Sequence, residues 1–190
     1  MPKVPAWKQR LHELHLNPPR YEASWYGPLD KLANHVFAAD CFMVKPQPKI
    51  RRSALPDDGD DNQPFEDEGL SLDSTGTPVT RDSYFEPDFI IVHVGDNRDI
   101  PLVCIEVKKE GGTYQSAGAQ LHEYIEVLAS KDPHDEFVAI LVLGGKFYCY
   151  SIHGRRAPTP GGDGWETADN LEGVFEKVAK GVLGGKRKHR

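Results

Sequence analysis

The stretch that decides the fold of this chain is EPDFIIVHVGDNRDIPLVCIEVKKEG, Glu86 to Gly111. Its two apolar runs, DFIIVHV and IPLVCIEV, flank the polar turn GDNRD, and this pattern predicts a β-hairpin. Strand side chains alternate between faces, so Glu106 and Lys108 share one face. If the hairpin is symmetric about Asn97, Asp88 lies directly opposite Glu106.

Two opposed carboxylates need an explanation, because their Cβ atoms lie about 4.5–5.5 Å apart and like charges there destabilise a strand pair. A divalent cation would compensate: Mg²⁺ takes one or two carboxylates and completes its shell with water and phosphate oxygens. Two alternatives stay open. The stretch could be an edge hairpin with a solvated acid and a solvated lysine, and a one-residue slip in register would move Glu106 to the opposite face.

The composition fits a single globular domain. A chain of 190 residues, 38% hydrophobic and 27% charged, is long enough for one core. No apolar run is long enough to span a membrane, and residues 1–20 lack the apolar centre of a signal peptide, so we expect no membrane partner. The three cysteines, Cys41, Cys104 and Cys149, are too far apart for a zinc module or a disulfide framework. We therefore expect a reduced intracellular protein.

The charge is unevenly distributed along the chain. The formal net charge is −6, but residues 57–68 alone carry seven acids and no base, so the remainder is close to neutral. Basic residues cluster at 45–52 and 186–190, and the acidic balance therefore does not exclude a nucleic-acid partner. The terminal basic cluster fits a nuclear address, a nucleic-acid grip or a solubilising tail.

Around the hairpin, the pattern indicates further elements. We expect a partly extended N-terminal extension over 1–20 and a helix from about Pro28, which suits a first turn, to Ala39. Residues from Pro46 to Thr77 read as a loop or disordered insert, with the acidic insert at about 53–77. Later segments predict a helix over 113–130, two strands around a Gly-Gly turn, and a helix over 170–181. The result is one α/β domain over 21–182, with a basic tail over 183–190.

Pro87-Asp88, followed by Glu106-Val107-Lys108, resembles the signature of the PD-(D/E)XK nuclease superfamily. The order of expected elements resembles the αβββαβ core of the restriction-endonuclease-like fold, a central mixed sheet flanked by helices. The resemblance covers Tyr21 to His153, with the first core strand expected within TPVTRDSYF (77–85). Two departures are the long gap between the two halves of the signature and the lack of a base-reading module.

This resemblance implies a metal-dependent nuclease that hydrolyses phosphodiester bonds. Asp88, Glu106 and the backbone carbonyl of Val107 would bind Mg²⁺ or Mn²⁺, which activates water and polarises the phosphate. Lys108 would orient or help to activate that water and offset charge in the transition state. Glu22 matches a helix acid that serves many members as a further metal ligand. It could equally be a helix-start acid favoured by the helix dipole.

Gln120 and Tyr124 resemble the Gln-x-x-x-Tyr element of the RecB-like branch. Residues four apart share a helix face, so both could face the substrate together with Lys109. Alternatively, Tyr124 joins the buried stripe of the helix and Gln120 is simply exposed. The element favours DNA over RNA as the partner, and a homodimer stays open because many members of the superfamily are dimers.

Two other classes of function compete with the nuclease. The first is a catalytically inactive nuclease-fold module that binds nucleic acid or a protein, whose hallmark would be loss of an acid or of the lysine. Because Asp88, Glu106 and Lys108 are all present, the sequence favours an enzyme. The second is an interaction domain recruited through the acidic insert. No zinc-peptidase, phosphate-loop or serine-hydrolase motif is present.

Overall fold

The structure is a computed structural model. It describes residues 4–51, 71–72, 78–79, 84–109, 111, 113–131, 133–152 and 165–184. The acidic run 57–68 and the basic cluster 186–190 lie outside the described residues. No helix within the described ranges has the length and apolar character needed to cross a membrane.

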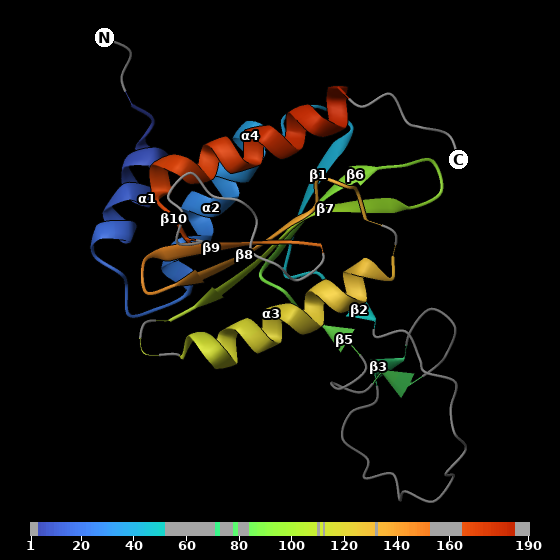
Figure 1. Ribbon diagram of the computed structural model, residues 1–190, viewed down its shortest axis with the longest axis horizontal. Coiled ribbons are helices and arrows are strands. Elements are labelled where there is room, and N and C mark those ends of the chain that lie inside the picture. Colours follow the sequence, from blue (N-terminus) through green and yellow to red (C-terminus); the bar gives the residue numbers. More distant parts are fainter. Residues whose placement is uncertain are drawn as a thin grey trace, which may run out of the picture.

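A mixed β-sheet forms the centre of the molecule (Figure 1). Within the described residues its six strands have the order β1-β6-β7-β8-β9-β10. Strands β7 and β8 are parallel, and the other neighbouring strands are antiparallel. The strands are β1 (Phe42–Pro46), β6 (Phe89–Val94), β7 (Asp99–Lys108), β8 (Val138–Leu143), β9 (Lys146–Ser151) and β10 (Trp165–Glu166).

Two pairs of short strands lie outside this sheet. Strand β2 (Ile50–Arg51) pairs with β5 (Tyr84–Phe85), and β3 (Ser71–Leu72) pairs with β4 (Pro78–Val79). Helices cover both faces of the main sheet. Helices α1 (Ala6–Leu16), α2 (Ala23–Val36) and α4 (Ala168–Gly184) lie on one side, and α3 (Tyr114–Ala129) lies on the other (Figure 1).

Strand β7 divides the hydrophobic core into two layers. Val103, Ile105 and Val107 are buried in the layer shared with α1, α2 and α4, whereas Cys104 is buried in the layer shared with α3. A strand buried on both faces reads as a nearly continuous apolar run, which explains the sequence of this segment. By alternation, Glu106 belongs to the α3 side, where it is the polar exception.

The fold class expected from the sequence is confirmed. Elements α2, β1, β6, β7, α3 and β8 follow one another in the order αβββαβ, and the sheet that they build is mixed and flanked by helices. The predicted hairpin is β6–β7, the helix over 113–130 is α3, and the two strands around the Gly-Gly turn are β8 and β9.

The first residues were expected to be partly extended, but 6–16 form helix α1. Leu11 and Leu14 are 1% and 3% exposed and pack into the core. Helix α1 contacts both α2 and α4. Tertiary burial of this narrow apolar stripe outweighs its weak local signal.

The boundaries of α2 were also wrong. The helix begins at Ala23, ahead of the expected Pro28, and ends at Val36 instead of Ala39. An interior proline removes one backbone hydrogen bond. Trp25, which is 2% exposed, packs into the core from the first turn, and this burial favours the earlier start.

The first core strand is β1 and not the segment 77–85. All five residues of β1 pair with β6, from Phe42 opposite His93 to Pro46 opposite Phe89. Proline is tolerated here because β1 is an edge strand. The last helix, α4, extends beyond the expected 170–181 at both ends, and the expected insert from Pro46 to Thr77 contains the short strands β2 and β3.

Candidate metal centre

Asp88 and Glu106 lie opposite each other at one end of the β6–β7 hairpin. Asp88 immediately precedes β6, and the pairing of Phe89 with Ile105 places it across from Glu106. The register shifts beyond Ile91, on the turn side of this position. The register predicted from the symmetry of the hairpin is therefore confirmed at the carboxylates.

Both carboxyl groups are buried, with Asp88 9% and Glu106 3% exposed. The pKa of Glu106 is raised to about 7, mainly by burial and also by the neighbouring charge of Asp88, against the lowering effect of Lys108. Burial also raises the pKa of Asp88. The surroundings of Asp88 and Glu106 therefore disfavour the charged form of both carboxylates. A bound cation would favour the charged forms again.

Two hydrogen bonds fix the orientation of Asp88. The Tyr26 hydroxyl donates to Oδ1 over 2.5 Å, and the Val107 backbone N–H donates to Oδ2 over 2.6 Å. Tyr26 lies in the first turns of α2, and its ring meets Phe89 edge-on with 5.7 Å between centroids. Burial and the hydrogen bond to Asp88 raise the pKa of Tyr26 above its ordinary value, so the hydroxyl keeps its proton.

Glu106 differs from Asp88 because one of its oxygens has no partner. Oε1 lies 2.5 Å from the Lys108 Nζ, whereas Oε2 is buried without a hydrogen bond. A buried, unsatisfied carboxylate oxygen is costly and calls for a proton, a water molecule or an ion. Oxygen donors of this kind are the ligands that Mg²⁺ and Mn²⁺ prefer, so the residues present fit the expected metal.

Lys108 shares a strand face with Glu106, as predicted, and the two side chains form an ion pair. The Lys108 side chain is 26% exposed, against 3% for that of Glu106. The lysine thus connects the buried carboxylate with the surface of the protein.

Glu22 and Lys109 join the start of α2 to the end of β7. The Lys109 backbone N–H donates to Glu22 Oε1 over 2.9 Å, and the charge of Glu22 contributes to the raised pKa of Asp88. In the part of the chain that the structure describes, no three His, Cys, Asp or Glu side chains come together as a metal-holding group. Glu22 therefore lies near the Asp88–Glu106 pair but outside it.

Gln120 and Tyr124 share a face of α3, since Gln120 Nε2 donates to the Tyr124 hydroxyl over 2.6 Å. Tyr124 is 3% exposed, and its ring packs against Phe85 at 5.2 Å, so it belongs to the buried stripe. Burial and then the charge of Glu106 raise the pKa of Tyr124. The pair lies beside the carboxylates, and its contact with substrate stays a prediction.

Tyr26 is the site residue that sequence reasoning missed. It follows Glu22 by four residues, and such residues lie on one face of a helix. That signal was hidden because the helix was expected to begin at Pro28, which left Tyr26 in a loop.

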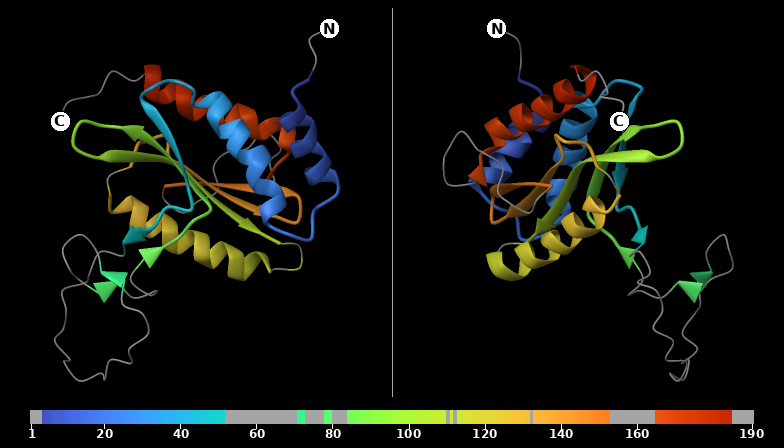
Figure 2. Two further views of the ribbon diagram at one scale, coloured as in Figure 1. Left: turned by 180° about the vertical axis from the view of Figure 1, so that it is seen from behind. Right: turned by 45° about the vertical axis from the view of Figure 1, so that its right-hand side comes forward.

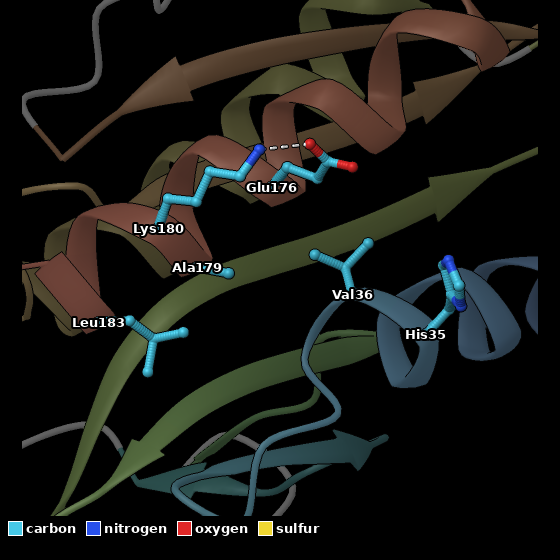
Figure 3. A pocket seen from close by; sticks show the side chains of 6 residues that line it. All are labelled: His35, Val36, Glu176, Ala179, Lys180 and Leu183. Carbon is cyan, nitrogen blue, oxygen red and sulfur yellow. Dashed lines mark hydrogen bonds and ion pairs between the residues drawn. The ribbon is translucent and has the colours of Figure 1, made fainter.

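A pocket of about 300 Å³ lies on the other side of the sheet, between α2 and α4 (Figure 3). It contains none of the candidate site residues. Figure 3 shows the Glu176–Lys180 ion pair on α4, facing the end of α2. The lining residues are His35, Val36, Glu176, Ala179, Lys180 and Leu183.

Comparisons with known proteins leave the family open. No family model matches the chain, and no curated protein matches it. A solved structure described as "cryoEM structure DrdV-DNA complex" is similar over 92% of this chain, with 15% sequence identity and a TM-score of 0.47. The chain spans only 13% of the length of that protein.

Proposed function

We propose that this chain is a metal-dependent nuclease that hydrolyses phosphodiester bonds of nucleic acid, with DNA favoured over RNA. The observation that carries the proposal is the buried pair of opposed carboxylates, Asp88 and Glu106, with Glu106 Oε2 unpartnered and Lys108 alongside. The fold order αβββαβ and the motif formed by these residues support it.

In this proposal Asp88, Glu106 and the Val107 carbonyl hold Mg²⁺ or Mn²⁺. When bound, the ion supplies Lewis acidity towards a phosphate oxygen and lowers the pKa of a coordinated water. Tyr26 and the Val107 amide keep Asp88 in one orientation through their hydrogen bonds. Lys108 lies next to Glu106 and would supply positive charge close to the phosphate, on which negative charge develops in the transition state.

The alternative is a nuclease-fold module that binds nucleic acid or a protein without cutting. The buried carboxylates speak against it, because an unpaired buried oxygen reduces stability and a binding surface gains nothing from it. An enzyme tolerates this cost because the oxygen is needed for metal binding.

The decisive experiment is cleavage of plasmid and single-stranded DNA with Mg²⁺ or Mn²⁺, beside EDTA and the Asp88→Asn variant. We expect cutting that requires both the metal and Asp88. The Glu176→Gln variant is the control: it likewise replaces a carboxylate by its amide, but on α4, where the carboxylate pairs with Lys180. It is expected to cut like the wild type.

Metal binding is measured separately, by titration with Mn²⁺ followed by electron paramagnetic resonance or calorimetry. Folded protein that binds Mn²⁺ through Asp88 but leaves both DNA and RNA intact would favour the binding module. Folded protein that binds no Mn²⁺ would overturn the metal site itself.

A further inference from the structure

The connection between α1 and α2, residues 17–22, runs along the end of the sheet where the carboxylates lie. At its start, the His15 ring nitrogen Nδ1 bonds the Gly145 carbonyl, and a Cβ atom on Gly145 would come within 2.9 Å of Pro18. At its end, Glu22 accepts the Lys109 amide. Both views of Figure 2 show this connection beside the β8–β9 turn.

The strand pairings place two cations at this end of the sheet. Lys108 pairs with Leu143 on β8, and Leu143 pairs with Lys146 on β9. Neighbouring strands lie about 4.8 Å apart, so these two lysines occupy one end of the sheet roughly 10 Å apart. The connection between α1 and α2 spans the distance between β7 and β9. Pro18, near its start, lies beside Gly145 in the β8–β9 turn, and Glu22, at its end, bonds Lys109 directly after β7. Arg20 and Tyr21, which lie between these two contacts in the sequence, are therefore at the same end of the sheet.

We call this surface, made of Arg20, Tyr21, Lys108, Lys109 and Lys146, the basic edge. Arg20, Lys109 and Lys146 are exposed, and Tyr21 is 68% exposed. The Arg20 guanidinium lies over the Tyr21 ring, 5.9 Å from its centroid. Among the acids of this region, Glu22 accepts the Lys109 amide, and Glu86, two residues before Asp88, is exposed.

We infer that the basic edge binds a single strand of nucleic acid and leads it to Asp88 and Glu106. Exposed cations along a path and an exposed aromatic ring are the two components of single-strand binding: the cations track phosphates and the ring stacks on an unpaired base. Arg20, Lys109 and Lys146 contact phosphates, and Tyr21 carries the base. This inference rests on the proposed nuclease function, because it assigns the substrate of the same site.

The test measures binding without cutting. Fluorescence anisotropy in EDTA compares a labelled single-stranded DNA oligonucleotide with its duplex, for full-length protein carrying Tyr21→Ala or the pair Arg20→Ala and Lys146→Ala. We expect Tyr21→Ala to weaken single-strand binding about tenfold and to change duplex binding little. We expect the double variant to weaken binding and to reduce its salt dependence by about one to two phosphate contacts.

Two variants on α4 serve as matched controls. Lys177→Ala removes an exposed lysine, and Leu183→Ala removes an apolar side chain that is 61% exposed. Both are expected to bind like the wild type.

Wild-type binding by both Tyr21→Ala and the double variant would overturn the basic edge, even if the protein binds Mn²⁺ and cuts DNA. Equal losses on single-stranded and duplex DNA with Tyr21→Ala would overturn the single-strand assignment. The proposed function fails in a different way: wild-type protein would neither bind Mn²⁺ nor cut, whatever these variants do in EDTA.

Discussion

At the scale of single residues, Tyr26 acts on the site through Asp88. Its hydroxyl donates to Oδ1, and hydrogen bonds of this kind fix the direction in which a ligand oxygen points. We predict that Tyr26→Phe weakens Mn²⁺ binding about tenfold, within the range that such partners contribute. Calorimetric titration with Mn²⁺ checks this.

The matched control is Tyr150→Phe, which removes a hydroxyl that bonds the Tyr114 hydroxyl. It is expected to leave the Mn²⁺ affinity unchanged. Equal affinity of the Tyr26→Phe variant and the wild type would show that Asp88 keeps its orientation without the tyrosine.

Glu106 makes the stability of the metal-free protein depend on pH. Its folded pKa of about 7 lies above its ordinary value of 4.5, so between these values the folded state binds more protons than the unfolded state. Stability is then lost as pH rises from about 4.5 to 7, by roughly 3 kcal/mol. We predict that Glu106→Gln stabilises the metal-free protein at pH 8 but not at pH 4.

Urea unfolding in EDTA at the two pH values measures this difference. If the wild type and Glu106→Gln unfold at the same urea concentration at pH 8, the charged Glu106 carboxylate does not lower the stability of the folded protein.

Lys108 is expected to matter for the reaction more than for binding. Its ammonium pairs with Glu106 at 2.5 Å, and in the proposed reaction it would lie close to the charge that develops on the phosphate. We predict that Lys108→Ala binds DNA nearly as well as the wild type and cuts at least about tenfold more slowly. Single-turnover cleavage at saturating protein separates the two effects. Cutting at the wild-type rate would remove Lys108 from the mechanism.

At the scale of elements, α1 is an integral part of the core. Leu11 is 1% exposed, whereas Leu16 on the same helix is 61% exposed. We predict that Leu11→Ala lowers the free energy of unfolding by about 2–5 kcal/mol and that Leu16→Ala changes it by less than about 0.5 kcal/mol. Urea unfolding compares the two variants. Similar small effects would mean that α1 detaches without disturbing the core.

The elements that the sequence predicts well are those whose local spacing of apolar residues shows which face is buried. Strands β6, β7, β8 and β9 and helix α3 have apolar residues at a period that matches the structure. Helix α1 and the first turn of α2 lack this signal, because they are stabilised by contacts with distant segments. The sequence did not predict β1, because this short edge strand is stabilised by its pairing with β6, which is distant in the chain.

The same division holds within the candidate site. Asp88, Glu106 and Lys108 lie on a hairpin whose register follows from the symmetry of its sequence. Tyr26 depends on where α2 begins, and the contact of Glu22 with the Lys109 amide depends on how α2 docks against β7. Contacts that form only when distant elements pack together correspond to no fixed spacing in the sequence, so they could not be predicted from it.

At the scale of the whole molecule, the proposed metal site would link metal binding to folding. A ligand that binds the folded state alone raises its stability, and a metal must displace the proton that Glu106 holds below pH 7. We predict that Mn²⁺ raises the melting temperature more at pH 8 than at pH 5.5. Differential scanning fluorimetry with and without EDTA measures the shift. A shift of the same size in Asp88→Asn would place the metal elsewhere.

The unpartnered oxygen of Glu106 also has a consequence for inheritance. Most mutations in a protein lower its stability, but replacing this acid by a residue without the charge is expected to raise it. In a lineage that no longer uses the chemistry, Glu106 would therefore be among the first residues to be substituted. The descendant proteins would then be more stable than their ancestor. If the proposed reaction is correct, an acid retained at this position among homologous genes would identify the copies in which selection still acts on it.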